Sequence, residues 1–176
     1  MKIPNTIRGV FGLAGLLAFA LIGAGCSDAP GPATGDVRPG AAVTAAAMNH
    51  YIAVQETLAA DSMEGVAAHA GELAAQLSSL DDAEAAAAAQ AIADNGDIDA
   101  ARRHFETVSI AVLDRLRTHG VEEGEYHEAH CRMAFGNRGA SWVQADTTVN
   151  NPYYGATMLR CGEIRETFAS TNGHAH

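Results

Sequence analysis

Residues 44–119 place apolar side chains every three or four positions, the spacing of one face of an α-helix. Three of the four segments in this range have a continuous apolar stripe. The stripes are Ala47, Tyr51, Val54 and Leu58 in the first segment, Val66, Ala70, Leu73, Leu77 and Leu80 in the second, and Ala101, Phe105, Val108, Val112 and Leu116 in the fourth. The third segment, AEAAAAAQAIA, has very high helix propensity but offers little side chain to bury. We therefore expect four helices.

Helix-capping residues mark the breaks between these segments. The first helix is expected from about Thr44 to Ala60. Asp61, with Glu64 three positions later, has the pattern of a capping box and predicts the start of the second helix. The other boundary signals are Asp82 and Asn95-Gly96 for the third helix, and Asp97 and His119-Gly120 for the fourth. Four helices with short connections predict a mostly α fold, an antiparallel up-down four-helix bundle.

Beyond Gly120 the helical spacing stops. Aromatic residues, glycines and sulfur-containing residues gather in residues 126–162, a composition that predicts turns and short extended pieces. A loop-rich Cys/Met segment of about 45 residues is too small to fold alone, so it is expected to pack on the bundle. The folded domain should span residues 44–165, and a mobile tail, residues 166–176, should follow it with His174 and His176.

The first 25 residues have the pattern of a bacterial secretory signal. Lys2 and Arg8 precede an apolar run, and Cys26 follows three small residues. This pattern predicts a signal peptide, residues 1–25, and a lipidated Cys26, with plain secretion as the alternative. Residues 26–43, rich in proline and small residues, are expected to form a flexible linker from the lipid anchor. The protein is thus expected on the periplasmic side of the bacterial cell envelope, anchored in the outer membrane.

Removal of this signal changes the charge balance. Two of the 11 basic residues and none of the 21 acidic residues lie in residues 1–25, so the mature chain has a formal net charge of −12. Nucleic acids and anionic lipid surfaces are therefore disfavoured as partners. Contact with the membrane is expected through the lipid anchor only.

Two short sulfur motifs carry the candidate chemistry. Cys131 and Met133 form a C-x-M pair, which would face one side in an extended segment, and Met158 and Cys161 form an M-x-x-C pair, which would share a face in a helical turn. Two thiolates and two thioethers suit copper(I) or silver(I) better than zinc, calcium or magnesium. The alternative is a Cys131–Cys161 disulfide with the methionines as packing, which would contribute roughly 3–4 kcal/mol by closing the intervening loop.

Two histidines precede the first motif. His127 and His130 bracket Glu128 as H-E-A-H, but this spacing is one residue too short for the zinc-protease helix, and no third ligand run follows. They are candidates for auxiliary metal ligands, or for exposed or capping histidines. The sequence contains no recognisable Ser-His-Asp set, phosphate loop or nucleotide fingerprint, so no catalytic residue is expected.

The run C-R-M-A-F … G-A-S-W-V-Q … N-P-Y-Y-G-x-x-M-L-R-C-G resembles the signature of the family called domain of unknown function 3347. The matching positions are Cys131, Met133, Ala134, Trp142, Gln144, Asn151 to Gly155, Met158, Leu159, Cys161 and Gly162. Arg132 stands where the family usually has proline, and Val143 where it usually has leucine. The first departure bears on the backbone beside the ligand pair. The resemblance extends over about residues 44–165.

This family is found in small secreted or lipid-anchored proteins and as an appendage of periplasmic adaptor subunits of copper and silver efflux pumps. The resemblance therefore implies soft-metal binding and, as a partner, a heavy-metal efflux adaptor or a metallochaperone. The leading hypothesis is a non-enzymatic lipoprotein that buffers copper(I) or silver(I) or passes it to an efflux partner. The alternative is a helical interaction module of an envelope complex, stapled by a Cys131–Cys161 disulfide and free of metal.

Overall fold

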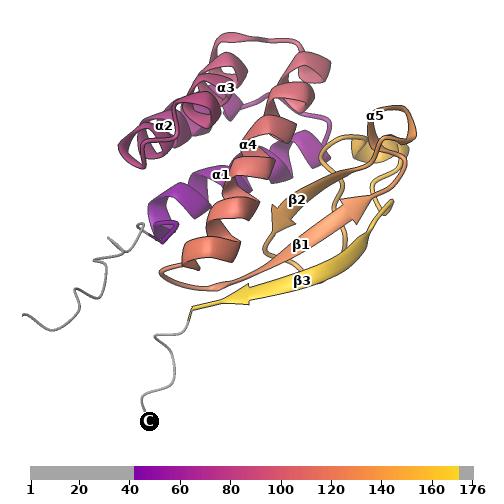
Figure 1. Ribbon diagram of the computed structural model, residues 1–176. Coiled ribbons are helices and arrows are strands. Elements are labelled where there is room, and N and C mark those ends of the chain that lie inside the picture. The colour runs from indigo at the N-terminus through magenta and orange to yellow at the C-terminus, as the bar shows by residue number, and fades with distance from the viewer. Residues whose placement is uncertain (1–41, 171–176) are drawn as a thin grey trace, which may run out of the picture. The chain divides into compact units, whose positions relative to one another are not determined.

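The computed structural model describes residues 42–170. The expected signal peptide, the lipidated Cys26, the linker before residue 42 and the tail histidines His174 and His176 lie outside the described residues. Between residues 42 and 170, no helix is long and apolar enough to cross a membrane. This part of the chain has four long helices and a small antiparallel sheet, so the fold is mostly helical (Figure 1).

Four helices occupy the range in which four were expected. They are α1 (Ala45–Ala59), α2 (Val66–Ser79), α3 (Ala83–Asp94) and α4 (Ile98–His119). The side chains of Thr44, Asp82 and Asp97 each accept a hydrogen bond from the backbone N–H three residues later, as N-caps do. The predicted starts of the first, third and fourth helices are thereby confirmed. Each helix packs against the next one along the chain, whereas α1 and α4 have few close approaches.

The predicted start of the second helix at Asp61 is wrong. α2 begins at Val66, after Gly65 in a left-handed conformation (φ +76°). Asp61 lies in the turn after α1 with a φ of +53°, and its carboxylate accepts hydrogen bonds from Arg102 and Ala156. The capping-box pattern fails here because these donors, one of them a charged guanidinium, hold the carboxylate away from the helix start.

Three strands follow the helices, where the composition predicted turns and short extended pieces but no sheet. They are β1 (Glu125–Cys131), β2 (Ala140–Gln144) and β3 (Glu163–Ala169), in the antiparallel order β2-β1-β3. A one-turn helix, α5 (Ala134–Asn137), separates β1 from β2, and a 3-10 turn, η1 (Gly155–Thr157), precedes β3. The expectation of a loop-rich segment is therefore corrected, because this segment is organised around a sheet. Residues 166–169 belong to β3 rather than to the predicted tail.

The central strand, β1, is buried on both faces and uses polar residues on each. His127, Glu128 and Ala129 are buried in succession. Glu128 forms an ion pair with Arg117 of α4, and His127 Nδ1 lies 3.0 Å from the Thr167 hydroxyl of β3. Such buried polar side chains are stable only because they have partners. A strand of this kind has neither the alternation nor the apolar run by which strands are recognised.

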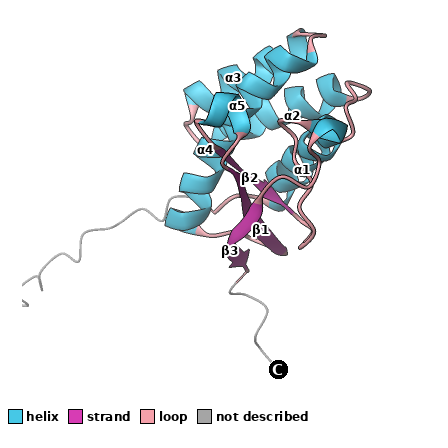
Figure 2. Cartoon of the chain, turned by 90° about the vertical axis from the view of Figure 1, so that its right-hand side faces the viewer, coloured by secondary structure: helices cyan, strands magenta, loops and turns pink. Residues whose placement is uncertain are grey.

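One apolar core joins the helices to the sheet. The Phe105 ring of α4 lies 4.9 Å from that of Tyr51 and 6.2 Å from that of Tyr153, and Tyr153 meets Trp142 of β2 edge-on at 5.7 Å. The helix residues expected inside are at most 2% exposed; they are Tyr51, Leu73, Phe105, Val108 and Val112. Figure 1 shows α4 alongside β2, and the quarter-turned view in Figure 2 shows the strands together below the helices.

Candidate metal centre at the Cys131–Cys161 pair

Cys131 and Cys161 meet at one end of the sheet. Cys131 is the last residue of β1 and pairs with Ala140 of β2, while Cys161 lies just before β3. The two cysteines form a disulfide with their Cα atoms 5.6 Å apart and a sequence separation of 30. Cys131 is fully buried, whereas Cys161 is partly exposed. Solvent therefore reaches the sulfur pair through Cys161.

A small opening of about 180 Å³ lies at Cys161. Its lining consists of His130, Arg132, Met133, Cys161, Gly162 and Glu163. Met133 is 48% exposed, so its thioether is not committed to the core. The opening thus collects a cysteine sulfur, a thioether, an imidazole and a carboxylate. The two sulfur donors are soft and the carboxylate is hard, so the sulfurs decide which metal ion the opening suits.

The surroundings of His130 beside the opening favour its neutral imidazole form. Its Nδ1 lies 2.9 Å from the Ser141 hydroxyl oxygen on β2. Burial lowers the pKa of His130 below its ordinary value, and the positive charge of Arg165 acts in the same direction. Gly139 is required beside the ring, because its φ is +80° and a Cβ there would lie 3.0 Å from His130 Nε2. Neutral imidazole is the form that binds metal ions.

Cys131 and Met133 do not lie in one extended segment. β1 ends at Cys131, and Met133 has helical backbone angles (φ −88°, ψ −14°) where the chain enters α5. Phe135, Gly136 and Asn137 then all have positive φ. Met133 therefore reaches the opening through a tight turn, and not through the strand alternation on which the C-x-M prediction was based.

Two of the predicted ligands do not line the opening. Met158 follows the η1 turn, and its carbonyl accepts a hydrogen bond from the Cys161 N–H at 2.9 Å, but its side chain is not part of the lining. His127 precedes Cys131 by four residues on β1, roughly 13 Å along a strand. The opening therefore brings together Cys161, with Cys131 behind it, Met133 and His130, without Met158 or His127.

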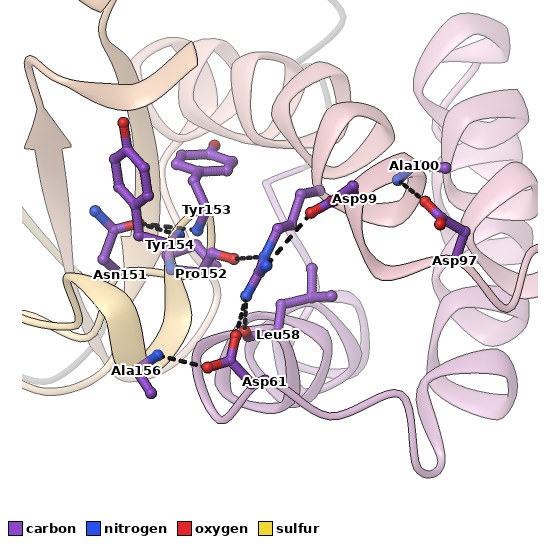
Figure 3. Close-up of polar contacts among 11 residues, drawn as sticks. Leu58, Asp61, Asp97, Asp99, Ala100, Asn151, Pro152, Tyr153, Tyr154 and Ala156 are labelled. Atoms are coloured by element: carbon purple, nitrogen blue, oxygen red, sulfur yellow. Dashed lines mark hydrogen bonds and ion pairs between the residues drawn. The ribbon is translucent and has the colours of Figure 1, made fainter. Parts of the chain in front are cut away.

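The N-P-Y-Y-G turn, residues 151–155, contacts the backbone at both Cys161 and Met133. Asn151 Oδ1 accepts hydrogen bonds from the N–H groups of Tyr153 (2.8 Å) and Tyr154 (3.2 Å), as Figure 3 shows. Asn151 Nδ2 donates to the Cys161 carbonyl at 2.8 Å, and the Tyr154 hydroxyl donates to the Met133 carbonyl at 2.6 Å. One turn therefore fixes the backbone of both Cys161 and Met133.

Arg102 of α4 and Asp61, in the turn after α1, connect the N-P-Y-Y-G turn to the helices by hydrogen bonds. Arg102 of α4 donates from Nε to the Pro152 carbonyl at 2.9 Å and from Nη2 to Asp61 Oδ1 at 2.5 Å. The other oxygen of Asp61 accepts from the Ala156 N–H at 2.7 Å. The Arg102 hydrogen bond, followed by that of Ala156, lowers the pKa of Asp61 below its ordinary value. Gly155 is required here, because a Cβ would lie 1.9 Å from Asp61 Oδ1.

Four residues support the site although the sequence did not indicate that they would contact it. They are Asn151, Tyr154, Asp61 and Arg102. For Asn151 a signal was present, because asparagine commonly hydrogen-bonds to backbone groups two or three residues on in turns. The pairing of Arg102 with Asp61 had no local signal, since the two residues are 41 residues apart.

The donor set fits a soft metal ion only in the reduced state. Within residues 42–170, no three His, Cys, Asp or Glu side chains are placed to hold a metal ion together. A metal ion at this site would therefore need the Met133 thioether and both cysteines as thiolates. In the disulfide, neither sulfur is a thiolate, so the oxidised site does not fit a metal ion.

Comparison with protein families identifies the helical part of the chain. Residues 47–124 match the family described as "Protein of unknown function (DUF3347)". This part of the chain is therefore similar to the DUF3347 family. The DUF3347 match extends from α1 to the turn before β1 and ends before Cys131, so the sulfur motifs that carry the resemblance in the sequence lie beyond it. No curated protein and no solved structure matches the chain.

Proposed function

We propose that this chain is a non-enzymatic metal-binding lipoprotein of the bacterial cell envelope, which holds copper(I) or silver(I) when the Cys131–Cys161 disulfide is reduced. It buffers this ion or passes it to an efflux partner. The observation that supports the proposal is the opening at Cys161, where a thioether and an imidazole join the sulfur pair. The four helices, taken as an antiparallel up-down bundle, serve as the rigid support of the site.

Reduction makes the site available. A dithiol reductant transfers two electrons and two protons to the disulfide and is itself oxidised to a disulfide, so Cys131 and Cys161 become thiols. Metal binding then displaces both thiol protons. With Cα atoms 5.6 Å apart, the two thiolates can reach one ion with little backbone movement. Oxidation rejoins the sulfurs and expels the ion.

Met133 completes the soft donor set. Its thioether binds copper(I) without competition from protons, and its exposed position lets it turn toward the sulfur pair. Two thiolates and one monovalent ion carry a net charge of −1, which the Arg132 guanidinium at the same opening offsets. His130 is an auxiliary ligand. Zinc is expected to bind more weakly because thioether is a poor ligand for it.

The test is copper(I) titration of the reduced full chain without oxygen, in competition with a colorimetric copper(I) chelator. Cys161→Ser should weaken binding by roughly 100-fold, because one of two thiolates is lost. Met133→Leu should weaken it by roughly 10-fold, about 1.4 kcal/mol. Met158→Leu is the matched control, because it makes the same change three residues from Cys161 at a methionine outside the opening. It should leave the affinity unchanged.

Two results would contradict this proposal. The reduced parent chain could take up no copper(I), or Cys161→Ser could hold copper(I) as tightly as the parent. If Met158→Leu weakened binding and Met133→Leu did not, the thioether ligand would be Met158, as the M-x-x-C motif alone predicts. Elemental analysis of chain purified without oxygen, with thiol titration on the same sample, shows which redox form carries metal.

The lipid anchor is part of the same proposal. Its test is metabolic labelling with a palmitate analogue, followed by separation of membrane and soluble fractions. The parent should be labelled and sediment with outer membrane, and Cys26→Ala should be unlabelled. An unlabelled parent in the soluble fraction would instead support plain secretion.

The Cys131–Cys161 disulfide favours a second candidate function. In this alternative the disulfide is permanent and joins the end of β1 to the segment before β3. The helices dock on an envelope complex, and no metal is bound. Thiol trapping in intact cells, with and without added copper, separates the two functions. A pair that stays fully oxidised in both conditions would favour the docking module, and copper-dependent protection of reduced thiols would favour metal binding.

A further inference from the structure

A second pair of potential metal ligands lies on helices α1 and α2. His50 of α1 and His69 of α2 meet with their Nδ1 atoms 3.2 Å apart, their ring centroids 5.5 Å apart and their ring planes tilted by 46°. Both side chains are half-buried. We propose that this pair binds a divalent first-row transition-metal ion, with copper(II) held most tightly.

The separation of the two nitrogens fits one bound ion. A tetrahedral zinc ion, with bonds of about 2.0–2.1 Å, holds two ligand nitrogens about 3.3 Å apart, and the same bonds at a right angle give about 2.9 Å. The observed 3.2 Å lies between these values. Linear coordination of a monovalent ion would need about 4 Å with the same bonds. The pair therefore suits divalent ions with neighbouring ligand positions, and not the linear geometry open to copper(I).

Two imidazole nitrogens define the class of ion further. Imidazole suits zinc, nickel and copper, and the usual affinity order places copper(II) above the other two. Glu72 lies three residues after His69, on the same side of α2, and its exposed carboxylate adds a negative field. Within residues 42–170 no group of three such ligands is formed, so water completes the coordination and the ion remains exchangeable.

Because His50 and His69 lie on different helices, binding of a metal ion should change the stability of the fold. Because one ligand comes from α1 and the other from α2, a bound ion joins the two helices in the folded state. Unfolding separates these ligands, so the ion should stabilise the folded state over the unfolded one. The inference is independent of the sulfur site, since it needs no reduced cysteine and concerns a different class of ion.

The test is thermal unfolding of the full chain, kept oxidised so that the Cys131–Cys161 disulfide stays closed, in a titration with copper(II) or zinc sulfate. The melting temperature of the parent should rise by several degrees and saturate, with copper(II) acting at lower concentration. His50→Asn and His69→Asn should each weaken binding by roughly 10-fold or more. Asparagine retains an amide near the position of Nδ1. His104→Asn on α4 is the matched control and should respond as the parent does.

Two further measurements make the outcome decisive. Replacement of both His174 and His176 by Asn should leave the rise intact, which separates the helix pair from the histidines at the end of the chain. In the parent, substoichiometric zinc should shift the ring NMR signals of His50 and His69 first, a readout that does not depend on folding of the variants. The inference is overturned if the parent does not respond, if His50→Asn and His69→Asn keep the response, or if other histidines shift first.

Discussion

The helical half of the domain, residues 44–120, and the sheet half, residues 121–170, are held together by different forces. The helices bury mainly apolar side chains, such as Leu73, Ile92 and Val108, none of which has exposed surface. Apolar burial has no preferred direction and scales with area, so spacing along the chain is enough to specify it. The sheet half depends more on buried polar side chains, each of which needs a partner in a particular direction.

Gln144 shows how the sheet half is specified. Its amide, 1% exposed, accepts hydrogen bonds from the Trp142 indole (3.1 Å) and the Asn150 N–H (3.1 Å) and donates to the carbonyls of Asp146 (2.5 Å) and Thr148 (2.9 Å). One side chain thus orders the whole loop after β2. Among the described residues, no buried side-chain nitrogen or oxygen lacks a partner. Hence the spacing of apolar residues along the chain specifies the helical half, whereas hydrogen bonds between particular buried polar groups specify the sheet half.

Tyr51 belongs to both halves. Its ring lies in the apolar core of the helices, while its hydroxyl accepts a hydrogen bond from the Val143 N–H (3.0 Å) and lies 2.7 Å from the Ser109 hydroxyl. Burial raises the pKa of Tyr51 above its ordinary value, so the phenol stays neutral. The two halves are therefore expected to unfold together.

The largest loss of stability is expected from a substitution in the apolar core that the two halves share. Phe105→Ala removes a ring between Tyr51 and Tyr153 and should lower the free energy of unfolding by about 3–5 kcal/mol. Urea denaturation should still show one transition, because the lost contacts belong to both halves. Ile110→Ala on the same helix, 56% exposed, is the control and should change this free energy by at most about 0.5 kcal/mol. Two separate transitions in the parent would show that the halves are independent.

The next effect should fall on the sheet half. Replacing both Cys131 and Cys161 by Ala opens the loop between them and should lower the free energy of unfolding by about 3–4 kcal/mol. Hydrogen exchange should accelerate more in β1 and β3 than in α2 and α3. Reductant should destabilise the parent similarly and leave the double variant unchanged. Equal acceleration in the helices would show that the disulfide stabilises both halves alike rather than the sheet half in particular.

The helices could be predicted because their signals are local. An apolar stripe such as that of Phe105, Val108 and Val112 declares a helical face, and an aspartate such as Asp82 or Asp97 caps the residues immediately after it. Asp61 was assigned wrongly for the converse reason. Its partner, Arg102, is 41 residues away, and no local pattern reports such a bond.

The strands and the shape of the site could not be predicted in the same way. β3 exposes its first five residues in succession, from Glu163 to Thr167, so it lacks the alternation of a half-buried strand. The sulfur residues were recognisable as a set from their type. The position of Met133 could not be predicted, because it depends on a turn in which Phe135 and Asn137 both have positive φ. Positive φ is rare for a bulky residue such as phenylalanine, and asparagine adopts it only in some turns.

A smaller effect on stability is expected from removing the hydrogen bonds by which Arg102 joins the two halves. Arg102→Met keeps much of the side-chain volume but removes the donors to the carbonyls of Pro152 and Leu58 and to the Asp61 carboxylate. The free energy of unfolding in urea should fall by about 2 kcal/mol, because buried acceptors lose their partners. Arg103→Met, at an exposed position on the same helix, is the control and should stay within about 0.5 kcal/mol of the parent. Equal values for the two variants would show that the tie does not stabilise the domain.

The smallest effect concerns the Asp61 carboxylate and depends on pH. Asp61→Asn should be less stable than the parent at pH 7, because the asparagine carries no charge to pair with the Arg102 guanidinium. Urea denaturation from pH 7 to pH 2 measures this difference, with Asp114→Asn, an exposed position on α4, as the control.

The direction of the pH dependence follows from the pKa of Asp61, which the Arg102 hydrogen bond lowers most, followed by that of the Ala156 N–H. The folded state therefore releases this proton more readily than the unfolded chain, where the carboxyl titrates near pH 3.9. The stabilisation is complete above that pH and is lost as pH falls through the lower pKa of the folded state. The parent and Asp61→Asn should thus converge in acid, whereas Asp114→Asn should show no such convergence. A constant gap between the parent and Asp61→Asn down to pH 2 would mean that the neutral hydrogen bonds of the turn, rather than the charge on Asp61, join the helices to the sheet.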